Sequence, residues 1–236
     1  MLKDILKRYR LHMTTLYMTL GMIWGMALFG IILFEIIMQV AIHNGKEPET
    51  FQMAFLMAFI MYFGAAIFAG SISSYTSFNT AISMGCTRKN YIIMRTIFLF
   101  ITNLFGILSV CAIYGLEMLY LNWHWKGYTL EVDLHFLMNP LLLFILWIAG
   151  TILPFFISAL TLRFGKVISI ITYTIWLIGC LSFAHIDEFI HSENPLLLVR
   201  IFQTLQPYQW SLILIAICAV LYMITYRIYK KQAVVA

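Results

Sequence analysis

Long apolar runs constrain this chain more than any other feature of its sequence. A run of about 20 apolar residues is long enough to cross the hydrocarbon core of a bilayer. Hydrophobic residues make up 62% of the chain and charged residues only 11%, whereas a soluble domain is closer to half apolar and a quarter charged. The sequence therefore predicts an all-α, polytopic membrane protein, with one transmembrane domain over residues 1–236 and no separate soluble domain.

Six apolar runs have the length of membrane-spanning helices. They cover residues 14–41, 51–74, 91–121, 138–162, 167–184 and 210–228. Between the last two runs, residues 185–209 are more polar and contain a short apolar stretch that cannot span a bilayer. We expect this segment to be an outer re-entrant or interfacial element.

Residues 1–13 have the pattern of an amphipathic helix. Apolar residues that include Leu2 and Ile5 fall on one face, and cations that include Lys3 and Lys7 fall on the other. A helix of this kind lies in the headgroup layer and binds anionic membrane lipid. The alternative is a plain charged anchor that precedes the first span.

The cations indicate how the spans are oriented. Of the 15 lysines and arginines, all but Lys46, Lys126 and Arg200 fall on the side that carries both chain ends. Cytoplasmic loops of membrane proteins carry the excess of lysine and arginine, so both termini are predicted to be cytoplasmic. The net charge of +5 is explained by orientation and requires no nucleic-acid partner.

The chain lacks the common signatures of catalysis. It has no Gly-x-Ser-x-Gly, no His-Glu-x-x-His and no phosphate-binding glycine-rich loop. The strongest metal candidate is the outer group of His185, Asp187, Glu188 and His191, for which solvated loop polarity is the simpler interpretation. We therefore expect no enzyme activity, no bound cofactor and no metal site in this chain.

Ionisable groups within the spans are scarce. Glu35 and Glu117 are the only acids inside predicted spans, and at ~1.5 Å of rise per residue both come near the outer face. Ion-coupled carriers need ionisable groups deep in the helix bundle. The pattern disfavours a proton or sodium relay, so the energy for any pumping must come from another subunit.

Side chains of two kinds recur at four-residue spacing in the first two spans. Methionine and phenylalanine surfaces adapt to irregular apolar ligands, although such residues also serve in ordinary packing and lipid contact. If an apolar substrate passes through the protein, this pattern predicts that it contacts these residues together with Glu35. The residues are Met18, Met22, Met26, Phe55, Met57, Phe59, Met61 and Phe63.

Small residues in the first span allow a close helix contact. Gly21 and Gly25 form a Gly-x-x-x-Gly pattern, and Gly30 follows. This spacing lets two helix backbones approach closely, either within the chain or between two copies.

The inner segment 77–89 is too short and too polar to be a span. Ser77 is suited to cap a short helix, Gly85 to end it and Thr87 to cap the following helix. The apolar side chains of Phe78, Ile82 and Met84 would then face a partner protein. The pattern predicts a short helix that serves as a cytoplasmic docking element.

The order Asn79-Thr80-Ala81-Ile82-Ser83-Met84-Gly85-Cys86-Thr87-Arg88-Lys89-Asn90-Tyr91 resembles a known pattern. It is similar to the segment after the second span in permease subunits of type-2 ATP-binding-cassette exporters of Gram-positive bacteria. In that family the segment is a coupling helix that sits in a groove of the ATPase subunit. The resemblance implies this role for Phe78, Asn79, Ile82, Ser83 and Met84, with Ser77, Arg88 and Lys89 at its margins.

The same resemblance implies the partners. They are two copies of a cytoplasmic ATPase that binds ATP and Mg²⁺, and a second permease that is either identical or related. The location implied is the bacterial plasma membrane. The cargo implied is an amphipathic or hydrophobic peptide, such as a toxin or an antimicrobial peptide.

Two functions of other classes stay open at this point. The chain could be a stand-alone channel or ion-coupled carrier, which would transport without an ATPase. It could also be a membrane peptide sensor or immunity protein, which would bind peptide without moving it.

Overall fold

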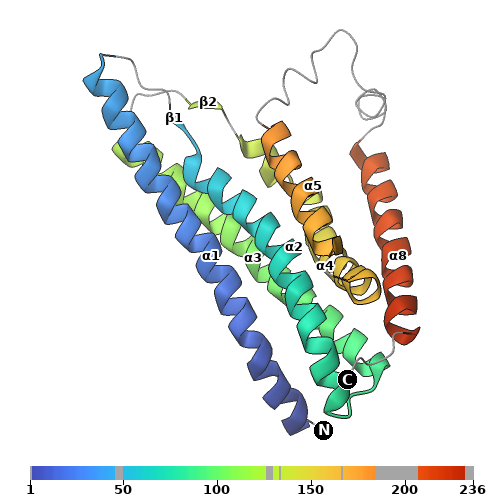
Figure 1. Cartoon of the computed structure of the whole chain (residues 1–236). Helices are drawn as coiled ribbons and strands as arrows, with labels where there is room; N and C mark the ends of the chain where they lie inside the picture. The colour runs from blue at the N-terminus through green and yellow to red at the C-terminus, as the bar shows by residue number, and fades with distance from the viewer. Residues whose placement is uncertain are drawn as a thin grey trace. The chain divides into compact units, whose positions relative to one another are not determined.

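The computed structural model describes residues 2–45, 50–125, 130–132, 134–165, 167–183 and 207–231, and this part of the chain is built almost wholly of helix (Figure 1). The helices are α1 (Leu2–His43), α2 (Met53–Ser83), α3 (Arg88–His124), α4 (Pro140–Phe164), α5 (Val167–Phe183) and α8 (Pro207–Lys231). Three short elements accompany them: β1 (Thr50–Phe51), β2 (Leu130–Val132) and the 3-10 helix η1 (Leu134–Met138).

Five of the described helices contain segments long and apolar enough to cross a membrane. These segments are Thr15–His43, Met53–Ser83, Arg88–His124, Pro140–Phe164 and Gln209–Lys231. The apolar part of α5, Val167–Gly179, is shorter, so the sixth span stays a prediction. The orientation of the termini also stays a prediction, whereas the expectation of a helical protein with membrane-spanning character is confirmed.

Several helix ends differ from those expected. α1 runs without a break from Leu2 to His43, so the structure shows no boundary between an interfacial helix and the first span. α8 begins at Pro207, three residues before the expected start of the last span, because proline lacks the N–H that a first helical residue leaves unbonded. Most of the expected outer segment, residues 185–206, lies outside the described part of the chain.

The expected break between the second span and a separate coupling helix is wrong. α2 continues through residues 75–83 as one helix. The polar residues here do not interrupt it, because their hydroxyls donate to carbonyls one turn back: Thr76 Oγ1 to Ile72 O at 3.0 Å and Ser74 Oγ to Gly70 O at 2.6 Å. Ser77 is therefore an interior residue of α2 and not a helix cap.

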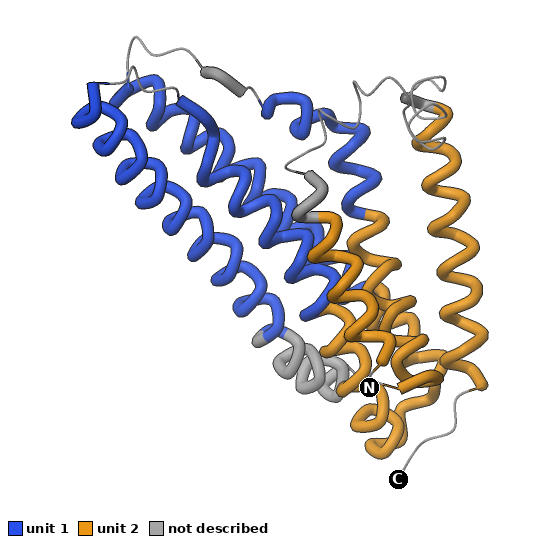
Figure 2. Tube along the Cα trace, turned by 45° about the horizontal axis from the view of Figure 1, so that its top comes forward, with its two compact units in different colours: residues 1–69, 97–147 blue, residues 70–96, 148–236 orange. Residues whose placement is uncertain are grey.

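The chain divides into two compact units (Figure 2). Unit 1 comprises residues 1–69 and 97–147, and unit 2 comprises residues 70–96 and 148–236. α2 and α3 each contribute one part to unit 1 and the other part to unit 2, while α1 belongs to unit 1 and α5 and α8 belong to unit 2.

The core of unit 1 forms where α1, α2 and α3 pack on one another. Fully buried side chains include Ile23 from α1, Phe55 from α2 and Val110 from α3. At Gly30 the α1 backbone comes so close to α2 that an added Cβ would lie 2.7 Å from Ala54 Cα. Gly21 and Gly25 have nothing within 4 Å of such a Cβ. The close helix contact thus lies at Gly30 rather than at the Gly-x-x-x-Gly pair.

Two short strands of unit 1 pair with each other. β1 and β2 are parallel, with Thr50 opposite Leu130 and Phe51 opposite Val132. This pairing precedes the start of α2 directly, so it helps to fix where that helix begins.

The Gly30 contact generates a matched pair of substitutions. Gly30→Ala is expected to lower stability by about 1–3 kcal/mol, because the new methyl meets backbone that can move only if the two helices separate. Gly25→Ala, the control, is expected to leave stability unchanged or slightly higher, because alanine favours helix and meets no neighbour. Thermal unfolding of the purified chain in detergent checks both, and equal effects of the two changes would contradict this packing.

Candidate functional site

The turn between α2 and α3 is tightly defined by its backbone. Gly85, at φ 77°, ends α2, with Gly85 N bonded to Ile82 O at 2.9 Å and Cys86 N bonded to Ala81 O at 3.0 Å. This is the Schellman arrangement, in which a left-handed residue lets the chain bond the last carbonyls of the helix. Thr87 Oγ1 then accepts from Asn90 N at 3.3 Å and caps α3. The predicted cap at Thr87 is confirmed, and Gly85 ends a helix as predicted, although this helix is α2 and not a separate short one.

A buried arginine holds the two helices together just behind this turn. Arg95 on α3 is 1% exposed, and its Nε donates to Ser74 Oγ on α2 at 2.7 Å. Its Nη2 donates to Gly70 O at 3.2 Å and also to the Ser73 hydroxyl. A buried guanidinium requires such acceptors because the interior offers it no water. Arg95 therefore ties the C-terminal part of α2 to the N-terminal part of α3.

An aromatic cluster fills the space beside Arg95. The Phe78 ring lies 5.3 Å from the Tyr91 ring and 5.1 Å from the Tyr229 ring, both edge to face. Tyr229 of α8 stacks on Phe155 of α4 with ring centroids 4.7 Å apart. The Tyr91 hydroxyl donates to Ser74 O at 2.5 Å. Four helices, α2, α3, α4 and α8, thus meet in one packed group within unit 2.

One arginine hydrogen bond and two hydroxyl pairs connect α8 to other helices of this group. Arg88 Nη1 donates to Lys230 O at 3.1 Å, which satisfies a carbonyl in the last turn of α8. The hydroxyls of Ser158 and Tyr229 are 2.7 Å apart, and those of Thr96 and Tyr222 are 3.4 Å apart.

The predicted docking residues fall into two groups. Ser83, Met84 and Lys89 are exposed at the turn, and the Met84 side chain is 53% exposed. Ser77, Asn79, Ile82 and Arg88 are half-buried. The turn therefore presents a small surface that combines an apolar thioether with a cation.

Phe78 lies elsewhere than expected. Its side chain is 0% exposed, because its ring occupies the aromatic cluster. The expectation that it faces a partner is not met, and within the described chain Phe78 supports the turn from inside.

The predicted substrate-path residues do not share one surface. Met18 and Met22 lie on the exposed face of α1, whereas Phe55 is fully buried in the core of unit 1, where its ring is 5.2 Å from that of Tyr114. The other five, Met26, Met57, Phe59, Met61 and Phe63, are half-buried. Four residues turn a helix by about 400°, so a four-residue stripe drifts by about 40° per step and changes face.

The two acids predicted near the outer face have defined partners in unit 1. Glu117 accepts from Ala54 N at 2.8 Å through one carboxylate oxygen and from Phe55 N at 2.7 Å through the other. These N–H groups are unbonded donors at the start of α2, so Glu117 caps that helix from a neighbouring helix.

Glu35 accepts its hydrogen bonds through a single carboxylate oxygen. Its Oε1 accepts from Trp125 Nε1 at 3.1 Å and from the Tyr120 hydroxyl. The partners of both carboxylates in the described chain are hydrogen-bond donors from neighbouring segments of unit 1.

The metal candidate falls outside the described residues, as does every side chain from 180 to 208. Within the part of the chain that the structure describes, there is no group of three or more His, Cys, Asp or Glu side chains placed to hold a metal ion.

Sequence reasoning missed the most buried parts of this site. Arg95 counted only as an inner cation, and Tyr229 and Phe155 were not singled out. The available signal was Ser73 and Ser74 on α2, because paired hydroxyls in an apolar helix are suitable acceptors for an arginine on its neighbour.

The fold and this site together indicate a multi-pass helical membrane protein with a packed group of helices behind one sharply capped turn. No protein-family model, no curated protein and no solved structure matches the chain. The assignment of a function therefore depends on the geometry and on the sequence pattern.

The two carboxylates provide a discriminating stability test. Glu117→Gln should cost about 1–3 kcal/mol, because an amide N–H₂ would replace one acceptor and face a buried N–H. Glu35→Gln should cost less than about 1 kcal/mol, since its remaining carbonyl oxygen still accepts both known donors. Thermal unfolding in detergent measures the two, and a larger loss for Glu35→Gln would refute the capping role of Glu117.

Proposed function

We propose that this chain is the permease subunit of an ATP-driven exporter and that the turn formed by residues 84–87 docks a separate ATPase subunit. The observation that carries the proposal is the combination at this turn. Met84 and Lys89 are exposed, while Phe78 and Arg95 directly behind them are fully buried. We call the exposed residues Met84 and Lys89 the tip, and the buried residues Phe78 and Arg95 its base. A coupling element requires an exposed tip on a rigid base, because a force on the tip then reaches the helices.

The connections behind the tip support transmission of movement. Phe78 contacts Tyr91 and Tyr229, and Tyr229 contacts Phe155 and Ser158, so a displaced turn acts on four helices. α2 and α3 are also unbroken helices of 31 and 37 residues. A rigid helix transmits a shift at one end along its whole length, which is a known way to couple nucleotide binding to a conformational change.

Two observations on how transport could be driven support the same proposal. The chain carries no ATP-binding motif, and the two acids within the predicted spans, Glu35 and Glu117, serve as hydrogen-bond acceptors for structural donors. A partner ATPase with ATP and Mg²⁺ would supply the driving force. Under this proposal two permease copies and two ATPase subunits form the exporter in the bacterial plasma membrane, and an amphipathic peptide is the cargo.

Substitutions at the tip and at its base separate docking from folding. Met84→Asp should remove copurification of the ATPase subunit and substrate-stimulated ATP hydrolysis while leaving thermal stability within about 0.5 kcal/mol, because the residue is exposed. Phe78→Ala should lower stability by about 3–5 kcal/mol, because it empties a buried ring site.

Thr80→Asp, on an exposed position one turn earlier, is the control for an added charge and should retain ATPase copurification. If Met84→Asp still copurified an ATPase with full stimulation, the turn would not be the docking element. If the parent chain copurified no ATPase and transported peptide nonetheless, the chain would be a carrier or a channel.

A further inference from the structure

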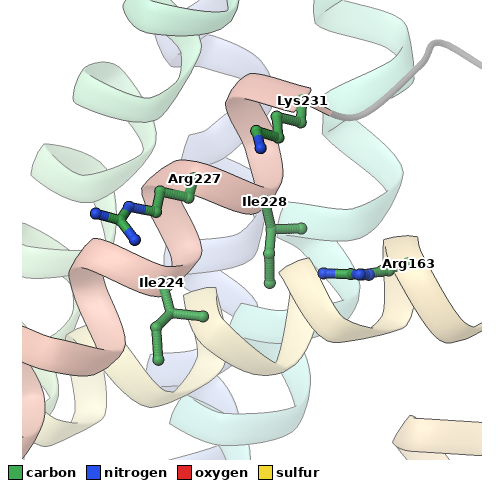
Figure 3. Close-up of a pocket in the computed structure, with 5 residues that line it drawn as sticks. All are labelled: Arg163, Ile224, Arg227, Ile228 and Lys231. Atoms are coloured by element: carbon green, nitrogen blue, oxygen red, sulfur yellow. The ribbon is translucent and has the colours of Figure 1, made fainter.

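A pocket in unit 2 is lined by three cations and two isoleucines. Its volume is about 490 Å³, within the range of about 300–1,000 Å³ that is usual for small-molecule sites. Arg163 comes from the end of α4, while Ile224, Arg227, Ile228 and Lys231 come from the last two turns of α8 (Figure 3).

The lining contains apolar and charged side chains from two helices. Figure 3 shows Ile224 and Ile228 projecting from α8 toward α4, with the Arg163 side chain extending from α4 toward Ile228. Ile228 is buried, whereas Arg163, Arg227 and Lys231 are exposed. A ligand that fills this pocket would need both an anionic group and an apolar part.

The charge of the surroundings favours an anion. The described residues of unit 2 contain no aspartate or glutamate. They do contain the three pocket cations together with Arg88, Lys89, Arg95 and Lys230, so the pocket cations have no acidic side chain among these residues to balance them. The carbonyl ends of α4 and α8 offset a part of this charge, since cations are favourable in a last helical turn.

The carbonyl ends do not account for the pocket as a whole. They explain why cations occur in the last turns, but not why cations from two helices line one cavity with two isoleucines. Arg163 also lies with its guanidinium carbon 5.3 Å from the centroid of the Phe164 ring, at a cation–π distance.

We propose that this pocket binds the phosphate of an anionic phospholipid, with Arg163, Arg227 and Lys231 around the phosphate and with Ile224 and Ile228 against the acyl chains. Guanidinium groups match phosphate oxygens with paired hydrogen bonds. Basic pockets between membrane helices are known sites for anionic headgroups. The isoleucine wall favours a lipid over a free anion, because a free phosphate has no use for apolar contact.

Such a lipid would connect the ends of α4 and α8. It would contact Arg163 on one helix and Arg227 on the other, and so stabilise the group of helices behind the α2–α3 turn. The proposal depends on the membrane character of the chain and not on the exporter function, so the failure of one leaves the other intact.

Native mass spectrometry of the full chain in detergent tests the site, with phosphatidylglycerol as the probe and phosphatidylcholine for comparison. The chain should retain phosphatidylglycerol preferentially, and this lipid should raise its melting temperature. The double variant Arg163→Gln/Arg227→Gln should bind phosphatidylglycerol about 30-fold more weakly and lose the thermal effect.

Two further variants serve as controls. Lys89→Gln removes an exposed cation that does not line the pocket, so the affinity of this variant for phosphatidylglycerol should differ from that of the parent chain by less than twofold. Arg227→Lys keeps the charge but loses the paired hydrogen bonds of the guanidinium, so it should weaken binding less than the double variant does. The lipid-free double variant should melt at the same temperature as the lipid-free parent chain, which separates a loss of binding from misfolding.

Three results would overturn the proposal. One is equal binding of phosphatidylglycerol by the parent chain and the double variant. The second is equal binding of phosphatidylcholine and phosphatidylglycerol. The third is displacement of the lipid by glycerol 3-phosphate at equal concentration, which would assign the site to a free phosphate instead of a lipid.

Discussion

A single buried arginine sets the geometry of the part of this protein that we propose to be functional. A buried guanidinium must find its acceptors within the protein, because the packed interior offers it no water. Arg95 finds them on α2, in the hydroxyls of Ser73 and Ser74 and the carbonyl of Gly70. These bonds fix α3 against α2 about two to four turns from the Gly85 turn. The direction in which the turn projects therefore depends on Arg95.

In both units, polar side chains of the long helices form hydrogen bonds that connect one helix to another. Glu117 caps the start of α2 in unit 1, and the Ser74 hydroxyl both donates to its own helix and accepts from Arg95 in unit 2. These groups are bonded within the protein, and the exposed turn, with Met84 and Lys89, is the surface that we propose for contact with another subunit.

The sequence predicted the features that have a strong local cause. Apolar runs located the long helices, and Gly85 and Thr87 were identified because a left-handed cap and a hydroxyl cap have few alternatives. The boundary placed before Ser77 was wrong, because hydroxyls that bond within their own helix do not end it. The burial of Phe78 could not be foreseen, since it depends on Tyr229, which is 151 residues away in the chain. The pairing of β1 and β2, also between distant segments, gave no sequence signal.

The most direct test of the central claim is site-specific photo-crosslinking in native membranes, with a benzophenone amino acid at position 84 and, as a comparison, at exposed position 80. Our account predicts that position 84 gives a strong adduct with an ATP-binding-cassette ATPase and that position 80 gives a weaker one or none. If position 84 labelled only lipid, or a protein without a nucleotide-binding domain, the turn between α2 and α3 would not be the coupling element.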